Sequence, residues 1–108
     1  MDKKIVAVSG YFDPIHVGHL EYLNEAKNLG DLLYVIVNND SQARLKKGKS
    51  FMNEEDRLRI VQSLGIVDKA ILSIDNDRSV SKTLIGIKPN IFANGGDQFE
   101  GSILEEQV

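Results

Sequence analysis

The sequence GYFDPIHVGH occupies residues 10–19 and separates two segments of different pattern. Residues 5–8, just before it, form a short β-branched run that is typical of a buried parallel strand. After it, apolar residues recur at helical spacing between Leu20 and Leu29, and Gly30 is a natural helix end. Residues 10–19 are therefore predicted to join a first strand to a first helix.

The same alternation continues along the chain. Further strands are predicted at residues 32–37, 70–72 and 91–93, and further helices at residues 53–65 and 80–87. The basic, glycine-containing segment 44–50 is predicted to be a mobile loop. This order predicts an α/β fold: a Rossmann-like, doubly wound parallel sheet with helices on both faces.

Ligands bind beyond the carboxyl ends of the strands in such folds. The loops expected at that edge are residues 10–15, 38–50, 73–78 and 94–100, and they hold nearly all the unusual polar chemistry of the sequence. This coincidence predicts a binding site at the edge, independently of any known family.

The length of 108 residues suggests a single domain, 1–108, because no linker or repeat divides it. Residues 102–108 have the pattern of an opening helix without a C-terminal signal. We therefore expect the chain to be C-terminally truncated and to lack its last strand and helix.

Composition excludes several classes of function. The net charge of −3 argues against a general nucleic-acid binder, which needs a basic face. The absence of cysteine excludes disulfides, zinc–thiolate sites and cysteine nucleophiles. The longest apolar run, residues 32–37, is too short to span a membrane, and the N-terminus lacks the features of a signal peptide. A cytoplasmic location without membrane contact is the default expectation.

His16 and His19 are three residues apart at the start of the predicted first helix, so they share a face. A helix N-terminus attracts anions, and imidazoles can donate hydrogen bonds to phosphate oxygens. Gly18 between them leaves room for a phosphate to approach the backbone. The residues predict a triphosphate site, and the alternative is that both histidines simply cap or pack the helix. A zinc site is disfavoured because no third histidine or cysteine is available.

Residues 10–19 resemble the His-x-Gly-His signature of the cytidylyltransferase-like nucleotidyltransferases. Members of that family include glycerol-3-phosphate cytidylyltransferase, the choline- and ethanolamine-phosphate cytidylyltransferases, heptose-1-phosphate adenylyltransferase domains and archaeal FAD synthetase. The resemblance extends from about Lys4 to Asp97, and it includes Leu-Gly-Asp at 29–31, Val-Asn-Asn-Asp at 37–40 and Glu-Asp-Arg at 55–57. It departs from the family in one respect, since the Ser/Thr-rich motif at the start of a final helix has no match here.

The resemblance implies an enzyme in which a phosphate oxygen of the acceptor attacks the α-phosphorus of CTP or ATP and pyrophosphate leaves. The first expectation is a glycerol-3-phosphate cytidylyltransferase-like enzyme acting on a small phosphorylated alcohol or sugar. The alternatives are a heptose-phosphate or FMN adenylyltransferase-like enzyme and a non-catalytic nucleotide-binding module. Mg²⁺ would accompany the triphosphate, held mostly by phosphate oxygens and water rather than by protein ligands. The family also implies a homodimer.

The resemblance assigns roles to individual residues. His16 and His19 would stabilise the transition state and the departing pyrophosphate, and Lys46 would bridge the acceptor phosphate and the α-phosphate. The residues expected to contact the nucleotide are Gly10, Tyr11, Phe12, Asp13, His16, Gly18, His19 and Asp97. Those that could bind the acceptor are Asp40, Lys46, Lys47, Lys49 and Arg78.

Several of these roles stay open from the sequence. Lys47 and Lys49 compete with Lys46 for the bridging role. Asp13 can contact the nucleotide or orient the loop, and Asp40 can serve the acceptor or form a turn. Arg57 can reach the site or form an ion pair inside the fold.

Overall fold

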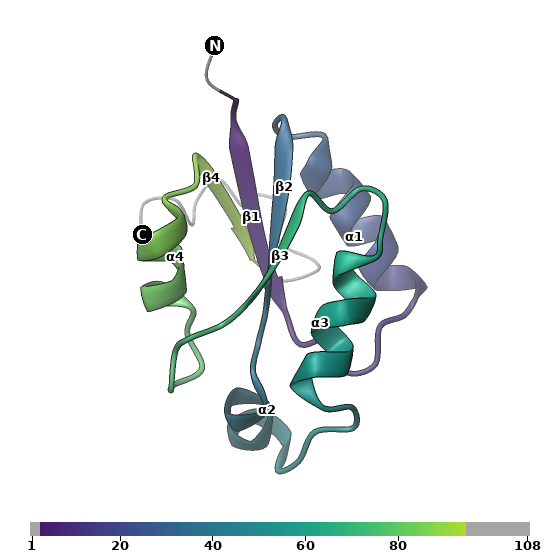
Figure 1. Cartoon of the computed structure of the whole chain (residues 1–108), viewed down its shortest axis with the longest axis vertical. Helices are drawn as coiled ribbons and strands as arrows, with labels where there is room; N and C mark the ends of the chain where they lie inside the picture. The colour runs from purple at the N-terminus through teal and green to yellow at the C-terminus, as the bar shows by residue number, and fades with distance from the viewer. Residues whose placement is uncertain (1–2, 95–108) are drawn as a thin grey trace.

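The computed structural model describes residues 3–94, in which strands and helices alternate (Figure 1). The strands are β1 (Ile5–Gly10), β2 (Leu32–Val37), β3 (Lys69–Leu72) and β4 (Ile91–Asn94). The helices are α1 (Val17–Lys27), α2 (Asp40–Lys47), α3 (Glu54–Gln62) and α4 (Ser81–Ile87). The four predicted strands and the three predicted helices are confirmed, with bounds that differ by a few residues.

The four strands form one parallel sheet in the order β3-β2-β1-β4. β1 is central, and it pairs Ile5 with Leu32 on one side and Val6 with Ile91 on the other. Residues 6–8 are completely buried because helices cover both faces of this strand, which explains its unbroken apolar run.

Two apolar cores lie on the two faces of the sheet. Alternate residues of β1 divide between them, since Val6 and Val8 face the larger core while Ala7 faces the smaller one. α1 and α3 cover the first face and α4 covers the second (Figure 1). The predicted doubly wound, Rossmann-like architecture is confirmed.

The prediction of a mobile loop at 44–50 is wrong for residues 44–47, because they belong to α2. The helix begins with a reciprocal cap, in which the Asn39 side chain accepts from the backbone N–H of Gln42 and the Gln42 side chain accepts from that of Asn39. Gly48 ends it in the left-handed conformation, at φ 84°. Capping, rather than an apolar stripe, therefore specifies this helix.

The strand order reverses beside β1, because the chain returns from β3 to place β4 on the other side of it. Such a switch point opens a crevice at the carboxyl ends of the strands. The Tyr22 hydroxyl of α1 spans this point, donating to the carbonyl oxygens of Ser9 at 3.3 Å and Ala93 at 3.1 Å.

Two predictions lie outside the described residues: the role of Asp97, and the opening helix at 102–108 from which truncation was inferred. Within residues 3–94, no helix has the length and apolar character needed to cross a membrane.

Candidate active site

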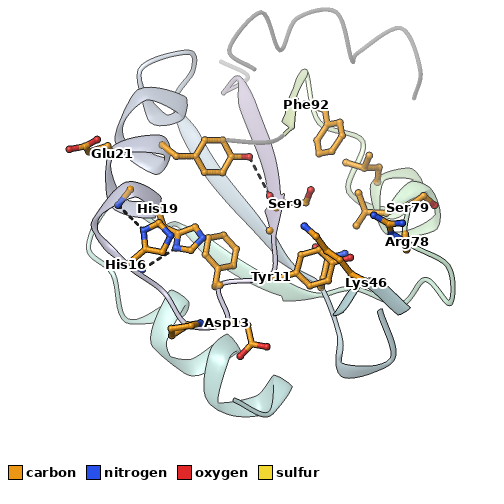
Figure 2. Close-up of a pocket in the computed structure, with 18 of the residues that line it drawn as sticks. Ser9, Tyr11, Asp13, His16, His19, Glu21, Lys46, Arg78, Ser79 and Phe92 are labelled. Atoms are coloured by element: carbon orange, nitrogen blue, oxygen red, sulfur yellow. Dashed lines mark hydrogen bonds between the residues drawn. The ribbon is translucent and has the colours of Figure 1, made fainter. Parts of the chain in front are cut away.

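A cavity of about 880 Å³ lies at the switch point. It is lined by residues from the loop after β1, the first turns of α1, the end of α2, and the segment that leads into α4. Figure 2 shows His16 and His19 on one side, Lys46 and Arg78 on the other, and Tyr11 between them. The predicted edge of the sheet therefore does carry a hollow site.

The two histidines are fixed by the backbone at the start of α1. His16 is the N-cap residue, and its Nδ1 accepts from the N–H of Gly18 at 3.0 Å. Nδ1 of His19 accepts from the N–H of His16, also at 3.0 Å. Because both Nδ1 atoms are acceptors, each neutral ring carries its proton on Nε2. The capping role and the binding role are therefore compatible, since each uses a different ring nitrogen.

The surroundings of His19 favour its neutral form. The ring centroids of His16 and His19 are 4.1 Å apart. Partial burial lowers the pKa of His19 below its ordinary value of 6.5, and the neighbouring His16 lowers it further. A neutral His19 retains the Nδ1 lone pair that the helix cap needs and presents an Nε2–H donor.

Two glycines shape the loop around the histidines. A Cβ atom at Gly18 would lie 2.9 Å from Cε1 of His16, so the His16 ring can fold over the helix start only because residue 18 lacks a side chain. A Cβ atom at Gly10 would lie 2.8 Å from Cζ of Phe12. Phe12 is 2% exposed and packs against His19, with ring centroids 4.8 Å apart, so this buried ring supports the His19 ring.

The Asp13 carboxylate binds the segment between α2 and α3. Its oxygens accept from the N–H groups of Phe51 at 2.8 Å and Met52 at 2.6 Å, and Lys47 lies 3.0 Å away. Burial raises the pKa of Asp13, but these hydrogen bonds and the Lys47 charge outweigh burial and hold the pKa below its ordinary value. Asp13 lines the cavity, and its carboxylate is used to hold the loop.

The structure separates the three candidate lysines. Lys46 lines the cavity, with Nζ 4.7 Å from the centroid of the Tyr11 ring. Lys47 is bound to Asp13, through the carboxylate and through the carbonyl oxygen at 3.0 Å. Lys49 is exposed and is not among the residues that line the cavity. The geometry therefore favours Lys46 for contact with a bound phosphate.

Arg57 and Asp40 form an ion pair inside the fold, with Nη2 of Arg57 2.7 Å from Oδ1 of Asp40. The Arg57 side chain is completely buried, and neither residue lines the cavity. Asp40 contributes instead to a second, shallower cavity of about 430 Å³. Of the two possibilities that the sequence left open for Arg57, the geometry favours the internal ion pair.

The far wall of the cavity comes from the segment before α4 and from α4 itself. Arg78 lies there with its side chain exposed, and sequence reasoning missed its neighbours Ser79, Val80 and Ser81. Their position depends on a buried carboxylate, because Asp75 accepts from the N–H groups of Lys82 at 2.8 Å and Thr83 at 3.0 Å. The sequence signal that could have indicated this wall is Asp75, which stands six residues before the first residue of α4.

Other lining residues were also missed by sequence reasoning: Ser9, Glu21, Tyr22, Asn38, Leu84 and Phe92. Most of them lie in strands or helices, where nothing in the sequence distinguishes them from framework residues. In the part of the chain from residue 3 to residue 94, no group of three His, Asp or Glu side chains could hold a metal ion.

Together, the fold and the histidine pair define a class, the nucleotide-binding α/β proteins that present a His-x-Gly-His motif at the first strand–helix junction. The chain belongs to the cytidylyltransferase-like family, whose model matches residues 7–107. The resemblance inferred from residues 10–19 is confirmed, and with it the broad class of nucleotidyltransferase enzyme.

Among curated relatives, the chain is 45% identical over 104 residues to the FAD synthase of Archaeoglobus profundus, covering 95% of this chain and 65% of that protein. It is 40% identical to the FAD synthase of Thermoplasma volcanium, again over 95% of this chain and 72% of that protein. The chain thus spans about two thirds of the length of these relatives.

A solved structure supports the same fold. It is the lipopolysaccharide core biosynthesis protein of Thermoplasma volcanium, which matches with a TM-score of 0.84 and 37% identity. The match covers 97% of this chain and 86% of that one.

Proposed function

We propose that this chain carries the nucleotide-transfer site of an FMN adenylyltransferase, which joins AMP from ATP to FMN and releases pyrophosphate. The observation that carries the proposal is the histidine pair, whose Nδ1 atoms are bound to the helix start and whose Nε2–H groups remain as donors. The names of the relatives in Archaeoglobus and Thermoplasma support FMN as the acceptor.

In the proposed complex the triphosphate lies against the N-terminus of α1. There the helix dipole and the Nε2–H groups of His16 and His19 stabilise negative charge. A phosphate oxygen of FMN attacks the α-phosphorus, the bond to the bridging oxygen breaks, and pyrophosphate carries that electron pair away. The histidines assist because charge increases on the departing oxygens, which neutral N–H donors at fixed positions stabilise.

Lys46 is proposed to draw the two reacting phosphates together. Both the FMN phosphate and the ATP α-phosphate are anionic, so their approach is opposed by charge repulsion. An ammonium group between them reduces that repulsion and orients the attack. The position of Lys46 over the Tyr11 ring, across the cavity from the histidines, suits this role.

Magnesium is proposed to enter with the nucleotide. The Asp13 carboxylate is already bound to backbone N–H groups and Lys47, which leaves Glu21, among residues 3–94, as an exposed carboxylate on the cavity wall. This donor set fits an ion held mainly by phosphate oxygens and water. Bound there, Mg²⁺ would neutralise charge on the triphosphate.

The relatives favour FMN over glycerol 3-phosphate, and therefore favour the adenylyltransferase alternative over the first expectation. FAD is FMN joined to AMP, so its synthesis from FMN needs an adenylyl donor, which makes ATP the proposed nucleotide. The homodimer and the cytoplasmic location remain predictions.

The test is pyrophosphate release with each pairing of ATP or CTP with FMN, glycerol 3-phosphate or a sugar 1-phosphate, with chromatography for FAD. The proposal expects release and FAD formation with ATP and FMN, and much less release with the other pairs. Preference for CTP and glycerol 3-phosphate would contradict it. ATP binding without turnover of any acceptor would instead indicate a non-catalytic binding module.

A further inference from the structure

Among the described residues, Arg57 is the largest side chain that is completely buried. Burying an arginine is costly unless its charge and its N–H groups find partners. Here Nη1 donates to the carbonyl oxygens of Tyr11 at 2.8 Å and Asn38 at 2.6 Å, while Nε donates to that of Met52 at 2.9 Å. With the bond to Asp40, four partners from three segments meet at one planar group: the loop after β1, the junction between β2 and α2, and the residues just before α3.

Two of these partners control the distance between the proposed catalytic lysine and the phosphate loop. Tyr11 belongs to the loop after β1, and its ring lies under Nζ of Lys46. Asp40 is the first residue of α2, the eight-residue helix that carries Lys46 in its last turn. The Arg57 guanidinium therefore holds both the helix that presents the lysine and the loop beneath that lysine.

We infer that Arg57 is a positioning residue for the transfer reaction: it sets the place of Lys46 relative to the phosphate loop, without touching the substrate itself. The inference rests on the proposed function. A guanidinium can serve the three carbonyl oxygens and the carboxylate at fixed angles, whereas an ammonium group is a point charge that cannot reach all of them. The other tie between α2 and the loop, from Lys47 to Asp13, is more exposed, because the Lys47 side chain is 38% accessible.

The experiment is a double-mutant cycle built from Arg57→Lys and Lys46→Ala, read as kcat/KM for pyrophosphate release from ATP and FMN. Because a misplacement of about 1 Å can cost about 100-fold in rate, Arg57→Lys is expected to lower kcat/KM by about 10- to 100-fold in the parent protein. In the Lys46→Ala background it should lower kcat/KM by less than about threefold, since the group it positions has been removed. Arg59→Lys, an exposed change on the same helix, is the matched control and should leave activity unchanged.

A purely structural arginine gives a different pattern. If Arg57→Lys lowers kcat/KM by the same factor, within about twofold, in the parent and in the Lys46→Ala background, the two effects are independent and the inference is overturned. All four proteins are assayed well below their melting temperatures. If Arg57→Lys does not fold, Asp40→Ala takes its place, because it removes the contact with α2 and leaves the three carbonyl bonds of Arg57 intact.

A second reading of the cycle separates this inference from the proposed function. The dissociation constant for Mg²⁺-ATP is measured by calorimetry for the same four proteins without acceptor. If the parent binds ATP but does not turn over FMN, the proposed function fails. The role of Arg57 is then decided by ATP affinity: a smaller effect of Arg57→Lys in the Lys46→Ala background supports it, and equal effects in both backgrounds overturn it. A parent protein without ATP affinity would overturn both.

Discussion

At the scale of single residues, each histidine of the motif uses one ring nitrogen for the protein and keeps the other for a ligand. Nδ1 of His16 accepts from the N–H of Gly18, in the first turn of α1, and Nδ1 of His19 accepts from the N–H of the N-cap residue His16; neither N–H has an intrahelical acceptor. This explains the spacing, since an N-cap residue and the residue three positions later form a capping box. The same spacing orients both rings toward the cavity.

Protonation of His19 should weaken this arrangement. The folded pKa lies below 6.5, because of burial and then the His16 charge, so the unfolded chain takes up the proton first as pH falls. The contribution of His19 to stability is complete above pH 6.5 and is lost as pH falls from there through the folded pKa. His19→Asn keeps an acceptor oxygen and cannot titrate, so its free energy of unfolding should fall less than that of the parent over this range. Urea titrations at several pH values measure the difference, and a difference that is flat with pH would refute the prediction.

Gly18→Ala should separate binding from stability. The added Cβ displaces the His16 ring and breaks its cap, at a cost of about 1 kcal/mol, while alanine in a helix returns about 0.5–1 kcal/mol. The melting temperature should therefore change little. ATP affinity should fall about tenfold, because a displaced ring loses one hydrogen bond to phosphate.

The matched control is Gly86→Ala in α4, where a Cβ meets no atom within 4 Å. It should raise stability by about 0.5–1 kcal/mol and leave ATP affinity unchanged. Equal losses of ATP affinity in the two variants would show that the space at Gly18 has no special role. Calorimetry and thermal melting measure both quantities.

At the scale of elements, α2 joins the two walls of the cavity. One end presents Lys46, and at the other the Gln42 side chain donates to the carbonyl oxygens of Asp77 at 2.6 Å and Ser79 at 2.8 Å. Asn39 donates from the same end to the carbonyl of Ser73 at 3.0 Å. The segment that carries Arg78 is therefore held by α2 as well as by Asp75.

Gln42→Leu should loosen that wall. It removes two hydrogen bonds to loop carbonyls and two acceptor contacts, with Asn38 and Asn39, so we expect a loss of about 2–4 kcal/mol in the free energy of unfolding. Gln62→Leu is the matched control, because Gln62 is exposed and accepts one bond, from Ala70, and should cost about 1 kcal/mol or less. Chemical denaturation compares them, and equal losses would contradict a special role for Gln42.

The same elements show what could be predicted from sequence. β1, β2 and the helix capped by Asn53 were readable because each carries its own signal, an apolar run or a cap followed by acidic residues. α2 was missed because its mean composition is basic and polar, although the Asn39–Gln42 capping box was present in the sequence. Arg57 was left ambiguous because three of its four partners, Tyr11, Asn38 and Asp40, are distant in the sequence and meet it only in the fold.

At the scale of the whole molecule, the sheet order determines where these parts meet. β1 lies between β2 and β4, so the loop after β1, the start of α1 and the approach to α4 open toward one cavity. Sequence patterns predicted that edge, since parallel strands share it. They predicted His16, His19 and Lys46 among the side chains that line the cavity, but could not choose Lys46 over Lys47 and Lys49, because that depends on how α2 packs against the loop after β1.

The central claim is that the two Nε2–H groups hold the polyphosphate, and one titration tests it most directly. The double substitution His16→Asn with His19→Asn keeps a capping oxygen near each Nδ1 position and removes both Nε2 donors. Calorimetry with Mg²⁺-ATP should show a dissociation constant raised by about 100-fold or more, since each lost bond to a charged group is worth about 1.5–3 kcal/mol, with little change in melting temperature. Unchanged ATP affinity in a folded double variant would contradict the account.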